Sequence, residues 1–245
     1  MTFEVKTTSN RKNAKQYYVL NGQVVPRVTE VLGQIVSFDL INWMRNSTPD
    51  EIKKSSRESL SIGSNLHDLV EEVLLNGIND GMRSTPYGEL LEAIEQWRLN
   101  ESVEVLKTEE YLYKQVTSMG YAGRCDIIAR VSGKLAILDV KTSGGTEPYE
   151  SHWQQVMAYK SALERMLSLG DIKLDDVNPF DQVKEVWVLT LTKIKNEAKE
   201  IVGWEFHPHV LNIDNEPRLA RIYQLQFDNL LEYWWLNNEI KQLKK

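Results

Sequence analysis

Two aspartates in the stretch from Gly120 to Ser143 have the spacing of a paired carboxylate site. Ser132 and Gly133 lie between two apolar runs, which predicts a two-residue hairpin turn. Counting back along both strands from this turn sets Asp126 directly opposite Asp139. Side chains that face each other across an antiparallel pair lie about 5 Å apart, where like charges repel. The sequence therefore predicts two carboxylates that need a cation.

Lys141 lies on the same predicted face as Asp139, about 7 Å further along the strand, because strand side chains alternate with a period of two. Oxygen atoms of Asp126, Asp139 and the Val140 carbonyl are donors that suit Mg²⁺ or Mn²⁺. Such a cation polarises a phosphoryl oxygen, and Lys141 would orient or deprotonate the attacking water. An Asp-x-Lys triplet alone is also common on solvated strands, so the facing Asp126 gives the pattern its specificity. The predicted reaction is phosphodiester hydrolysis.

The composition sets wider limits on function. The chain has 245 residues, of which 42% are hydrophobic and 26% charged, as in ordinary globular proteins. A net charge of -6 argues against coating nucleic acid through a broad basic surface, because such binding depends on counterion release from phosphates. It is compatible with a nucleic-acid enzyme whose carboxylates bind metal. Cys125 is the sole cysteine, which excludes disulfide frameworks, cysteine-rich zinc sites and four-cysteine iron-sulfur clusters.

The sequence also predicts where the protein resides. No apolar run approaches the roughly 20 residues of a membrane span. The first residues, MTFEVKTTSNRKNAKQ, lack the apolar segment of a secretory signal. We therefore expect no membrane partner and a cytoplasmic location.

Short elements are expected before residue 62. Asn21-Gly22 predicts a hairpin between residues 17–20 and 23–26, and helices are expected from near Thr29 and over residues 40–45. Residues 47–61 are polar and mixed in charge, which predicts a loop or an arch over a binding channel. Trp43 is interpreted as a core residue in preference to a ligand contact.

Two helices and a strand are expected before the central hairpin. Apolar residues at helical spacing predict a helix that ends at Gly77, and His67 lies beside its apolar stripe. Taken alone, His67 fits a histidine at the edge of the core. A second helix is expected over 88–100, followed by a strand over 103–114 in which Glu109 and Glu110 occupy opposite faces. The alternation does not say which face is buried.

After the hairpin, a helix over 150–169 places Gln155 and Tyr159 at i and i+4, where both could bond to a common partner. Strands over 185–192 and 201–206 follow, and residues 216–243 are predicted to form a long helix. The predicted inner face of this last helix consists of Leu219, Ile222, Tyr223, Leu230, Tyr233 and Trp234.

This order of elements predicts an α/β (α+β) fold with a mixed central sheet flanked by helices. We expect residues 1–245 to form one domain. Its residues 1–100 would make a mainly helical N-terminal part, and residues 101–245 a catalytic core that contains the sheet.

Three motifs resemble the PD-(D/E)xK nuclease superfamily: GYAGRCD, LDVKTS with its aspartate 13 residues after the first, and QVMAY. The chain is most similar to the RecB-like branch, which includes the mitochondrial genome maintenance exonuclease and related phage and bacterial exonucleases. The resemblance runs from VPRVTEVL near Pro26 through GSNLHDLVEEVL at Gly63 to the QVMAY helix, somewhat over half of the chain. It implies a restriction-endonuclease-like core, Mg²⁺ or Mn²⁺ as cofactor, and a microbial or virus-encoded DNase.

The resemblance also implies roles for individual residues. Asp126 and Asp139 match the metal-binding aspartates of the family, and Lys141 matches its catalytic lysine. His67 matches a helix histidine that approaches or binds the metal. An acidic residue on the strand before the hairpin is also implied, and spacing favours Glu109 over its neighbour.

Gln155 and Tyr159 match a Q-x-x-x-Y motif that contacts DNA or orients the lysine in the family. Trp43 or Tyr121 could stack on bases, although core packing explains either aromatic equally well. The full set expected at the DNA consists of Gln155, Tyr159, Arg124, Thr142, Ser143 and Tyr121.

The chain departs from the family pattern in two ways. Cys125 stands where many members have a proline, and a single cysteine cannot hold the iron-sulfur cluster of some relatives. The leading hypothesis is a divalent-metal-dependent DNA exonuclease that acts on single strands or DNA ends in replication, repair or recombination. A structure-specific or restriction-type endonuclease would use the same residues. A catalytically inactive DNA-binding subunit with the nuclease fold is the third hypothesis, and the oligomeric state stays open.

Overall fold

Two sheets and seven helices make up the part of the chain that the computed structural model describes, residues 1–8, 16–35, 38–198 and 200–244. The side chains of residues 38–40, 43 and 54–61 also lie outside this description. The elements are β1 (Phe3–Thr7), β2 (Gln16–Leu20), β3 (Gln23–Val25), α1 (Val28–Leu32), α2 (Phe38–Arg45), α3 (Pro49–Asn76), α4 (Asp80–Arg83), α5 (Gly88–Asn100), β4 (Glu104–Val116), β5 (Met119–Val131), β6 (Lys134–Ser143), α6 (Glu150–Leu169), β7 (Glu185–Lys195), β8 (Ile201–Asn212) and α7 (Pro217–Leu243). The predicted α+β class is confirmed.

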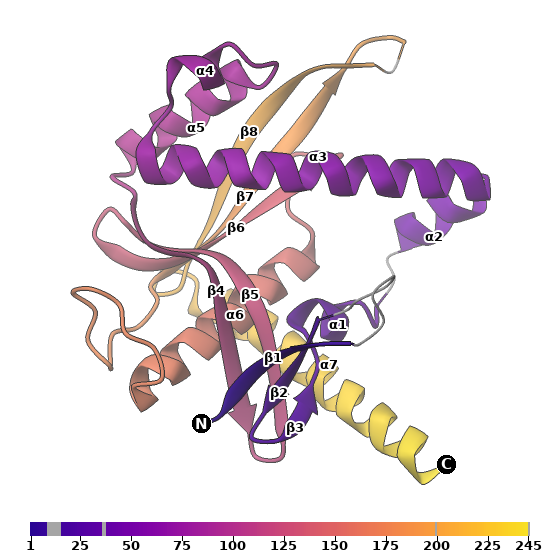
Figure 1. Cartoon of the computed structure of the whole chain (residues 1–245), viewed down its shortest axis with the longest axis vertical. Helices are drawn as coiled ribbons and strands as arrows, with labels where there is room; N and C mark the ends of the chain where they lie inside the picture. Colours follow the sequence, from indigo (N-terminus) through magenta and orange to yellow (C-terminus); the bar gives the residue numbers. More distant parts are fainter. Residues whose placement is uncertain (9–15, 36–37, 199, 245) are drawn as a thin grey trace.

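The larger sheet has the order β4-β5-β6-β7-β8 (Figure 1). All neighbouring strands are antiparallel except β6 and β7, which are parallel. Parallel neighbours need a crossover connection, and α6 supplies it. The mixed sheet therefore places the carboxyl end of β6 close to the start of α6.

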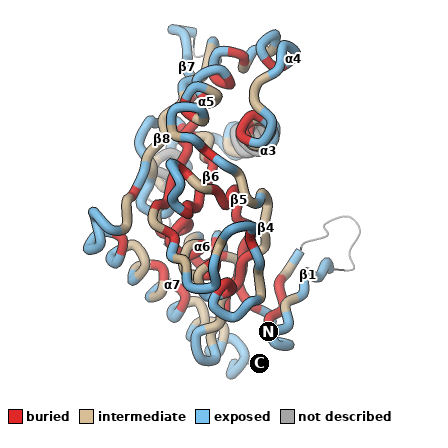
Figure 2. Tube along the Cα trace, turned by 90° about the vertical axis from the view of Figure 1, so that its left-hand side faces the viewer, coloured by how far each residue is buried: buried red, intermediate tan, exposed pale blue. Residues whose placement is uncertain are grey.

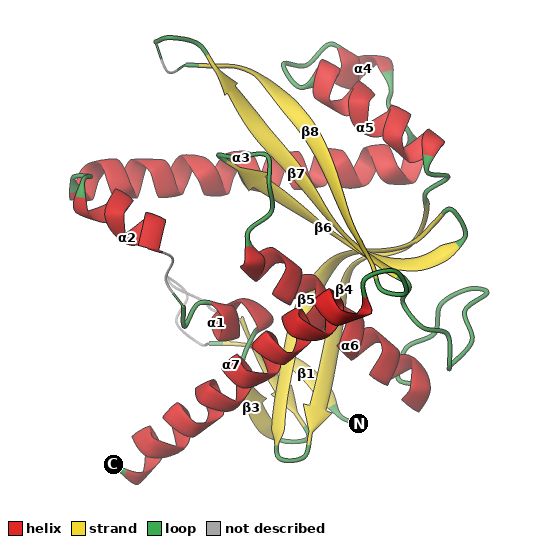
Figure 3. Ribbon diagram, turned by 180° about the vertical axis from the view of Figure 1, so that it is seen from behind, coloured by secondary structure: helices red, strands yellow, loops and turns green. Residues whose placement is uncertain are grey.

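Helices cover both faces of this sheet (Figure 3). On one face α1, α6 and α7 pack over a core that includes Ile128 and Ile137. On the other face α3 and α5 pack over a second core that includes Ile127 and Leu138. The three central strands, β5, β6 and β7, are buried along most of their length, whereas the edge strands β4 and β8 are mostly half-buried or exposed (Figure 2). Consecutive strand residues thus belong to opposite cores, as the period of two requires.

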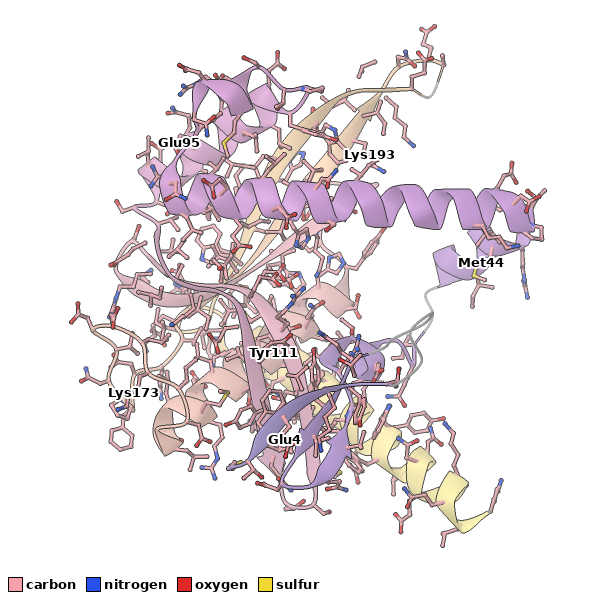
Figure 4. All side chains as sticks on the ribbon, in the orientation of Figure 1. Glu4, Met44, Glu95, Tyr111, Lys173 and Lys193 are labelled. Carbon is pink, nitrogen blue, oxygen red and sulfur yellow. The ribbon has the colours of Figure 1, made fainter. Side chains whose placement is uncertain are left out.

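The smaller sheet, β1-β2-β3, packs beside β4. The predicted hairpin at Asn21-Gly22 is confirmed, and both residues have positive φ as a type I′ turn requires. Strand β1 was not predicted. Tyr111, labelled in Figure 4, packs edge-on against Tyr18 with ring centroids 5.8 Å apart, while Leu112 on the opposite face of β4 is fully buried. Both faces of β4 are therefore covered.

The long hairpin of β7 and β8 reaches beyond the other strands of its sheet (Figures 1 and 3). Lys193, labelled in Figure 4, lies on this extension with its Nζ atom 5.7 Å from the centre of the Trp204 ring. Such a cation–π contact helps to hold an exposed hairpin together. Strand β8 continues to Asn212, six residues past its predicted end.

The predicted loop over residues 47–61 is wrong, because α3 runs as one helix of 28 residues from Pro49. Thr48 and Glu51 form a capping box: the Thr48 hydroxyl accepts a hydrogen bond from the Glu51 amide at 3.3 Å, and the Glu51 carboxylate accepts one from the Thr48 amide at 2.7 Å. Proline at the first helical position is also a helix-start signal. These local signals outweigh the polar composition that favoured a loop.

The predicted inner face of α7 is partly wrong. Leu219, Ile222 and Tyr233 are exposed, whereas Ala220 and Phe227 lie in the core together with Leu231. Apolar residues occur around most of the circumference of this helix, so the periodicity alone does not select one face. The exposed apolar residues of α7 therefore need a separate explanation.

Candidate active site at the fork between two strands

The site lies where β5 and β6 separate. The predicted register is confirmed, since Val131 pairs with Lys134 and the ladder continues to Ile127 with Leu138. The ladder ends there, one residue before Asp126 and Asp139 would pair. The carboxylate of Asp126 instead accepts a hydrogen bond from the Val140 amide at 2.9 Å. This carboxylate therefore lies between the two strands where they separate.

Asp139 is fully buried and its two oxygen atoms have different neighbours. Gln155 of α6 donates a hydrogen bond from Nε2 to Oδ1 at 3.0 Å. The Nζ atom of Lys141 lies 2.6 Å from Oδ2. This contact is a close ion pair, and the Lys141 ammonium is the charged partner of Oδ2. Two residues apart on β6, Asp139 and Lys141 point to the same side, as predicted.

Burial makes the charged forms of both aspartates costly. Burial is the main cause that raises the pKa of Asp139 to about 6; Lys141 opposes this shift and the nearby Asp126 carboxylate adds to it. Burial also raises the pKa of Asp126, against the influence of Lys141 and of the Val140 amide. Burial is the largest cause of both shifts, and a neighbouring carboxylate adds to each, Asp126 for Asp139 and Glu109 for Asp126. The cost of charging these carboxylates supports the predicted cation requirement.

Lys141 supplies a positive charge to this cluster. Burial lowers its pKa, but the carboxylates of Asp139 and Asp126 outweigh that effect, so the pKa lies above its ordinary value. Lys141 is therefore an ammonium group at neutral pH in this arrangement. It can orient a water molecule or offset negative charge on a phosphate, but it cannot accept a proton in this state.

His67 reaches the fork from α3, on the other side of the sheet from α6. Its Nδ1 atom lies 3.5 Å from Oδ2 of Asp126. Burial and the charge of Lys141 lower the pKa of His67, although Asp139 and the backbone at Val140 act in the opposite direction. The ring is therefore neutral near pH 7, and a neutral imidazole nitrogen is able to bind a metal ion.

Glu109 stands at the outer edge of the cluster. Its carboxylate pairs with Arg124 of β5 at 2.5 Å, and burial raises its pKa. The neighbouring charges of Glu71 and Asp68 on α3 raise that pKa further, whereas Arg124 lowers it. Glu109 also has φ of 52°, a left-handed conformation that is unusual for a strand residue. Its charge raises the pKa of Asp126, which places it nearer to the site than the sequence could establish.

The chemical types of the donor atoms at the fork suit a hard divalent cation. Asp126, Asp139 and the carbonyl of Val140 offer oxygen, and His67 offers nitrogen. Oδ2 of Asp139 is fully buried and contacts the Lys141 ammonium at 2.6 Å. Over residues 1–8, 16–35, 38–198 and 200–244, no three His, Cys, Asp or Glu side chains are grouped closely enough to hold a metal ion. The Lys141 ammonium lies beside Asp139, in the space that a bound cation would also need.

Several residues expected at DNA have structural roles. Gln155 also donates a hydrogen bond to the Tyr159 hydroxyl at 3.3 Å. Both side chains are buried on α6, and Gln155 holds the Asp139 carboxylate from the side of that helix. Tyr121 is 1% exposed, and its hydroxyl donates to the Ala158 carbonyl. The expectation that Tyr121 stacks on a base is therefore wrong, because its ring lies within the core against Phe227.

The remaining predicted DNA contacts lie around the rim of the site. Arg124 is exposed and paired with Glu109, and Thr142 lies close to Gly63 of α3. The Ser143 hydroxyl is nearly covered and accepts a hydrogen bond from the Gly145 amide at 3.2 Å. The side chain of Trp43 lies outside the described residues.

His152 is a residue near the site that the sequence did not indicate. It lies in the first turn of α6, one turn before Gln155, and its Nδ1 atom accepts a hydrogen bond from the Tyr149 amide at 3.3 Å. Burial and then the charge of Lys141 lower the pKa of His152 to about 4. Its ring is therefore neutral with the proton on Nε2. The signal that could have found it is its i, i+3 spacing from Gln155.

Fold and site together define an α+β protein with one buried carboxylate, one partly buried carboxylate and a lysine at a strand fork. No family model matches the chain, and no curated protein matches it. Among solved structures, the chain is similar to "Crystal structure of SSO0001", with 14% identity, a TM-score of 0.38, and coverage of 85% of this chain and 78% of that one. No helix among the described residues is both long and apolar enough to cross a membrane.

Proposed function

We propose that this protein is a divalent-metal-dependent DNA exonuclease of the PD-(D/E)xK superfamily, with a restriction-endonuclease-like core. The observation that carries the proposal is the group of Asp126, Asp139 and Lys141 at the fork, with Gln155 bonded to Asp139. Asp139 is fully buried and Asp126 and Lys141 are partly buried, and taking such charges out of water costs stability that the ion pair of Asp139 and Lys141 offsets only in part. A purely structural hairpin would gain stability from apolar residues at these positions.

The proposed cation is Mg²⁺ or Mn²⁺, held by Asp126, Asp139 and the Val140 carbonyl, with His67 as a further donor. When bound, it would supply Lewis-acid activation of a phosphate oxygen and of a water molecule. Lys141 would then be free to bind the scissile phosphate and to offset the charge that grows on it. Hydrolysis adds water across one P–O bond, so one product carries the phosphate and the other a hydroxyl.

The chain's other residues position these groups. Gln155 holds the orientation of Asp139, and the Val140 amide holds Asp126. Arg124 and Glu109 lie at the exposed side, where the strand of a nucleic acid would enter. We infer that DNA single strands or DNA ends are the substrate, and that the protein acts in replication, repair or recombination in a microbial or viral setting.

The test is digestion of end-labelled single-stranded DNA by purified protein with Mg²⁺ or Mn²⁺. Asp139→Ala and Lys141→Ala should each lower the rate by at least about 100-fold, because each removes charge stabilisation of the transition state. Lys184→Ala and Asp214→Ala are matched controls, since these residues form an exposed ion pair at 3.1 Å away from the fork. Undiminished digestion by both site variants would contradict the proposal.

The same residues could serve an endonuclease, and a closed circular substrate separates the two reactions. An exonuclease leaves the circle intact and degrades the linear form from an end. Nicking of the circle by wild type but not by Asp139→Ala would favour the endonuclease. Tight DNA binding without any digestion would favour an inactive DNA-binding subunit.

A further inference from the structure

The C-terminal helix carries a row of apolar residues that are exposed to solvent in the part of the chain that the structure describes. With Leu219 as the first a position, they occupy a and d in the first, third and fourth of four successive heptads. We call the eight a and d residues of these heptads the outer stripe: Leu219, Ile222, Gln226, Asn229, Tyr233, Leu236, Ile240 and Leu243. Six of the eight are apolar, and all six are exposed.

Exposure is greatest toward the end of the helix. The exposed fractions are 56% for Tyr233, 51% for Leu236, 47% for Ile240 and 81% for Leu243. This half of α7 projects away from the rest of the molecule (Figures 1 and 3). A contiguous exposed apolar stripe on a projecting helix marks a surface that gains free energy when another surface covers it.

The anchored side of the helix is a different face. Phe227 and Leu231 pack in the core, and Trp235 donates a hydrogen bond to the Gly120 carbonyl at 3.1 Å. These residues hold α7, a helix of 27 residues and about 40 Å, by its inner side and leave the apolar residues of the outer stripe exposed. The helix is therefore already formed and oriented before any partner binds.

We propose that the outer stripe pairs with the same stripe of a second copy of this chain, as a parallel two-stranded coiled coil. A strict a and d repeat of seven residues is the pattern for helix pairing. The last two heptads have Leu236 and Leu243 at d and a β-branched Ile240 at a, the combination that favours two strands.

The charges beside the stripe select the parallel orientation. Glu232 and Glu239 occupy g positions, and Lys244 occupies an e position. In a parallel pair a g residue faces the e residue five positions later on the partner helix, which sets Glu239 of each copy against Lys244 of the other. In an antiparallel pair the g positions face each other, and Glu232 would oppose Glu239.

The second heptad contributes a polar layer that fixes the alignment. Gln226 and Asn229 fill its a and d positions. The side-chain oxygen of Gln226, Oε1, accepts a hydrogen bond from Nε2 of Gln154 in the same chain at 3.1 Å. The side-chain nitrogen of Gln226 therefore remains to donate across the pair. A buried polar layer penalises helices that slip by one heptad. This pairing extends beyond the proposed nuclease activity and does not depend on it.

Sedimentation equilibrium of the full chain over a range of concentrations tests the pairing. The mass should rise from 28.4 kDa toward twice that value as concentration increases. Ile240→Glu should raise the dissociation constant at least about tenfold, because it places charges in an apolar layer. Ile201→Glu is the matched control, since Ile201 of β8 is 43% exposed and lies outside the stripe. A wild-type mass that stays at one chain, or equal weakening by both variants, would overturn the proposal.

Charge reversal and cross-linking test the orientation. Glu239→Lys should weaken association, and the double variant with Lys244→Glu should restore it. Leu236→Cys should form a disulfide between two copies under oxidised glutathione, because like d residues face each other in a parallel pair. The native Cys125 is buried and does not compete. Failure of the double variant to recover, or cross-linking no faster than that of Ile201→Cys, would overturn the parallel arrangement.

Discussion

The fork between β5 and β6 and the outer stripe of α7 depart from the usual distribution of side chains in opposite directions. At the fork, Asp139 and Lys141 are charged groups where the surrounding core is apolar. On the outer stripe, Leu236 and Ile240 are apolar groups where the surroundings are water. Each arrangement costs stability in the isolated chain and becomes favourable when a partner binds.

The two regions differ in the partner that would satisfy them. The fork offers hard oxygen donors in a rigid frame of two strands and a helix, which suits a small cation and a phosphate. The outer stripe offers a long apolar surface without pockets of its own, which suits another helix. Buried charge therefore indicates chemistry, and exposed apolar surface indicates assembly.

The largest effect on stability is expected where α7 is anchored. Phe227 is fully buried, so Phe227→Ala should lower the free energy of unfolding by about 3 to 5 kcal/mol. Ile240→Ala, on the outer stripe, should change it by less than about 0.5 kcal/mol at concentrations where the protein is monomeric. Chemical denaturation of both variants measures the difference. Equal losses would mean that the two faces of α7 are not distinct.

A smaller effect comes from the neutral histidine near the fork. Because the pKa of His152 is lowered from 6.5 to about 4, its contribution to stability is present above pH 6.5 and is lost as pH falls toward 4. Since the side chain is partly exposed, the loss should amount to roughly 2 kcal/mol. His152→Gln keeps an acceptor for the Tyr149 amide but cannot titrate. Its unfolding free energy should fall less than that of wild type between pH 6.5 and 4; parallel curves would contradict the assigned shift.

The smallest effect concerns the alignment of Asp139. Gln155→Leu removes the donor to Oδ1 and should lower the rate of DNA digestion by about 10-fold to 100-fold, as loss of a residue that orients a metal ligand does. Gln154→Leu is the matched control. Gln154 and Gln155 are each 7% exposed, but Gln154 bonds to Gln226 instead. Equal rate losses in both variants would show that the effect is one of folding.

The sequence predicted the fork better than it predicted α7, for physical reasons. A two-residue turn fixes the register of both strands, and the register then fixes which residues approach each other. Residue types and spacing were therefore sufficient to bring Asp126, Asp139 and Lys141 together. For α7 the helix itself was predictable, but apolar residues around its circumference left the buried face undetermined.

Other features depend on contacts that spacing does not encode. The ladder ends one residue before Asp126 because its carboxylate bonds to the Val140 amide, which depends on how the two strands diverge. The approach of Glu109 to the site requires its left-handed φ, and nothing in the alternation of β4 indicates that. The second half of α3 was predicted, but its first part over residues 49–61 was not, because its polar composition resembles a loop although Thr48 and Glu51 form a capping box.

Titration calorimetry with Mn²⁺ tests most directly whether the fork is a cation site. Wild type should bind one ion, and Asp126→Asn and Asp139→Asn should each lose measurable binding, because each removes a buried carboxylate ligand. Asp214→Asn, which changes an exposed aspartate away from the fork, should bind as wild type does. Absence of binding in wild type, or unchanged binding in Asp139→Asn, would contradict the assignment of the fork as the metal site.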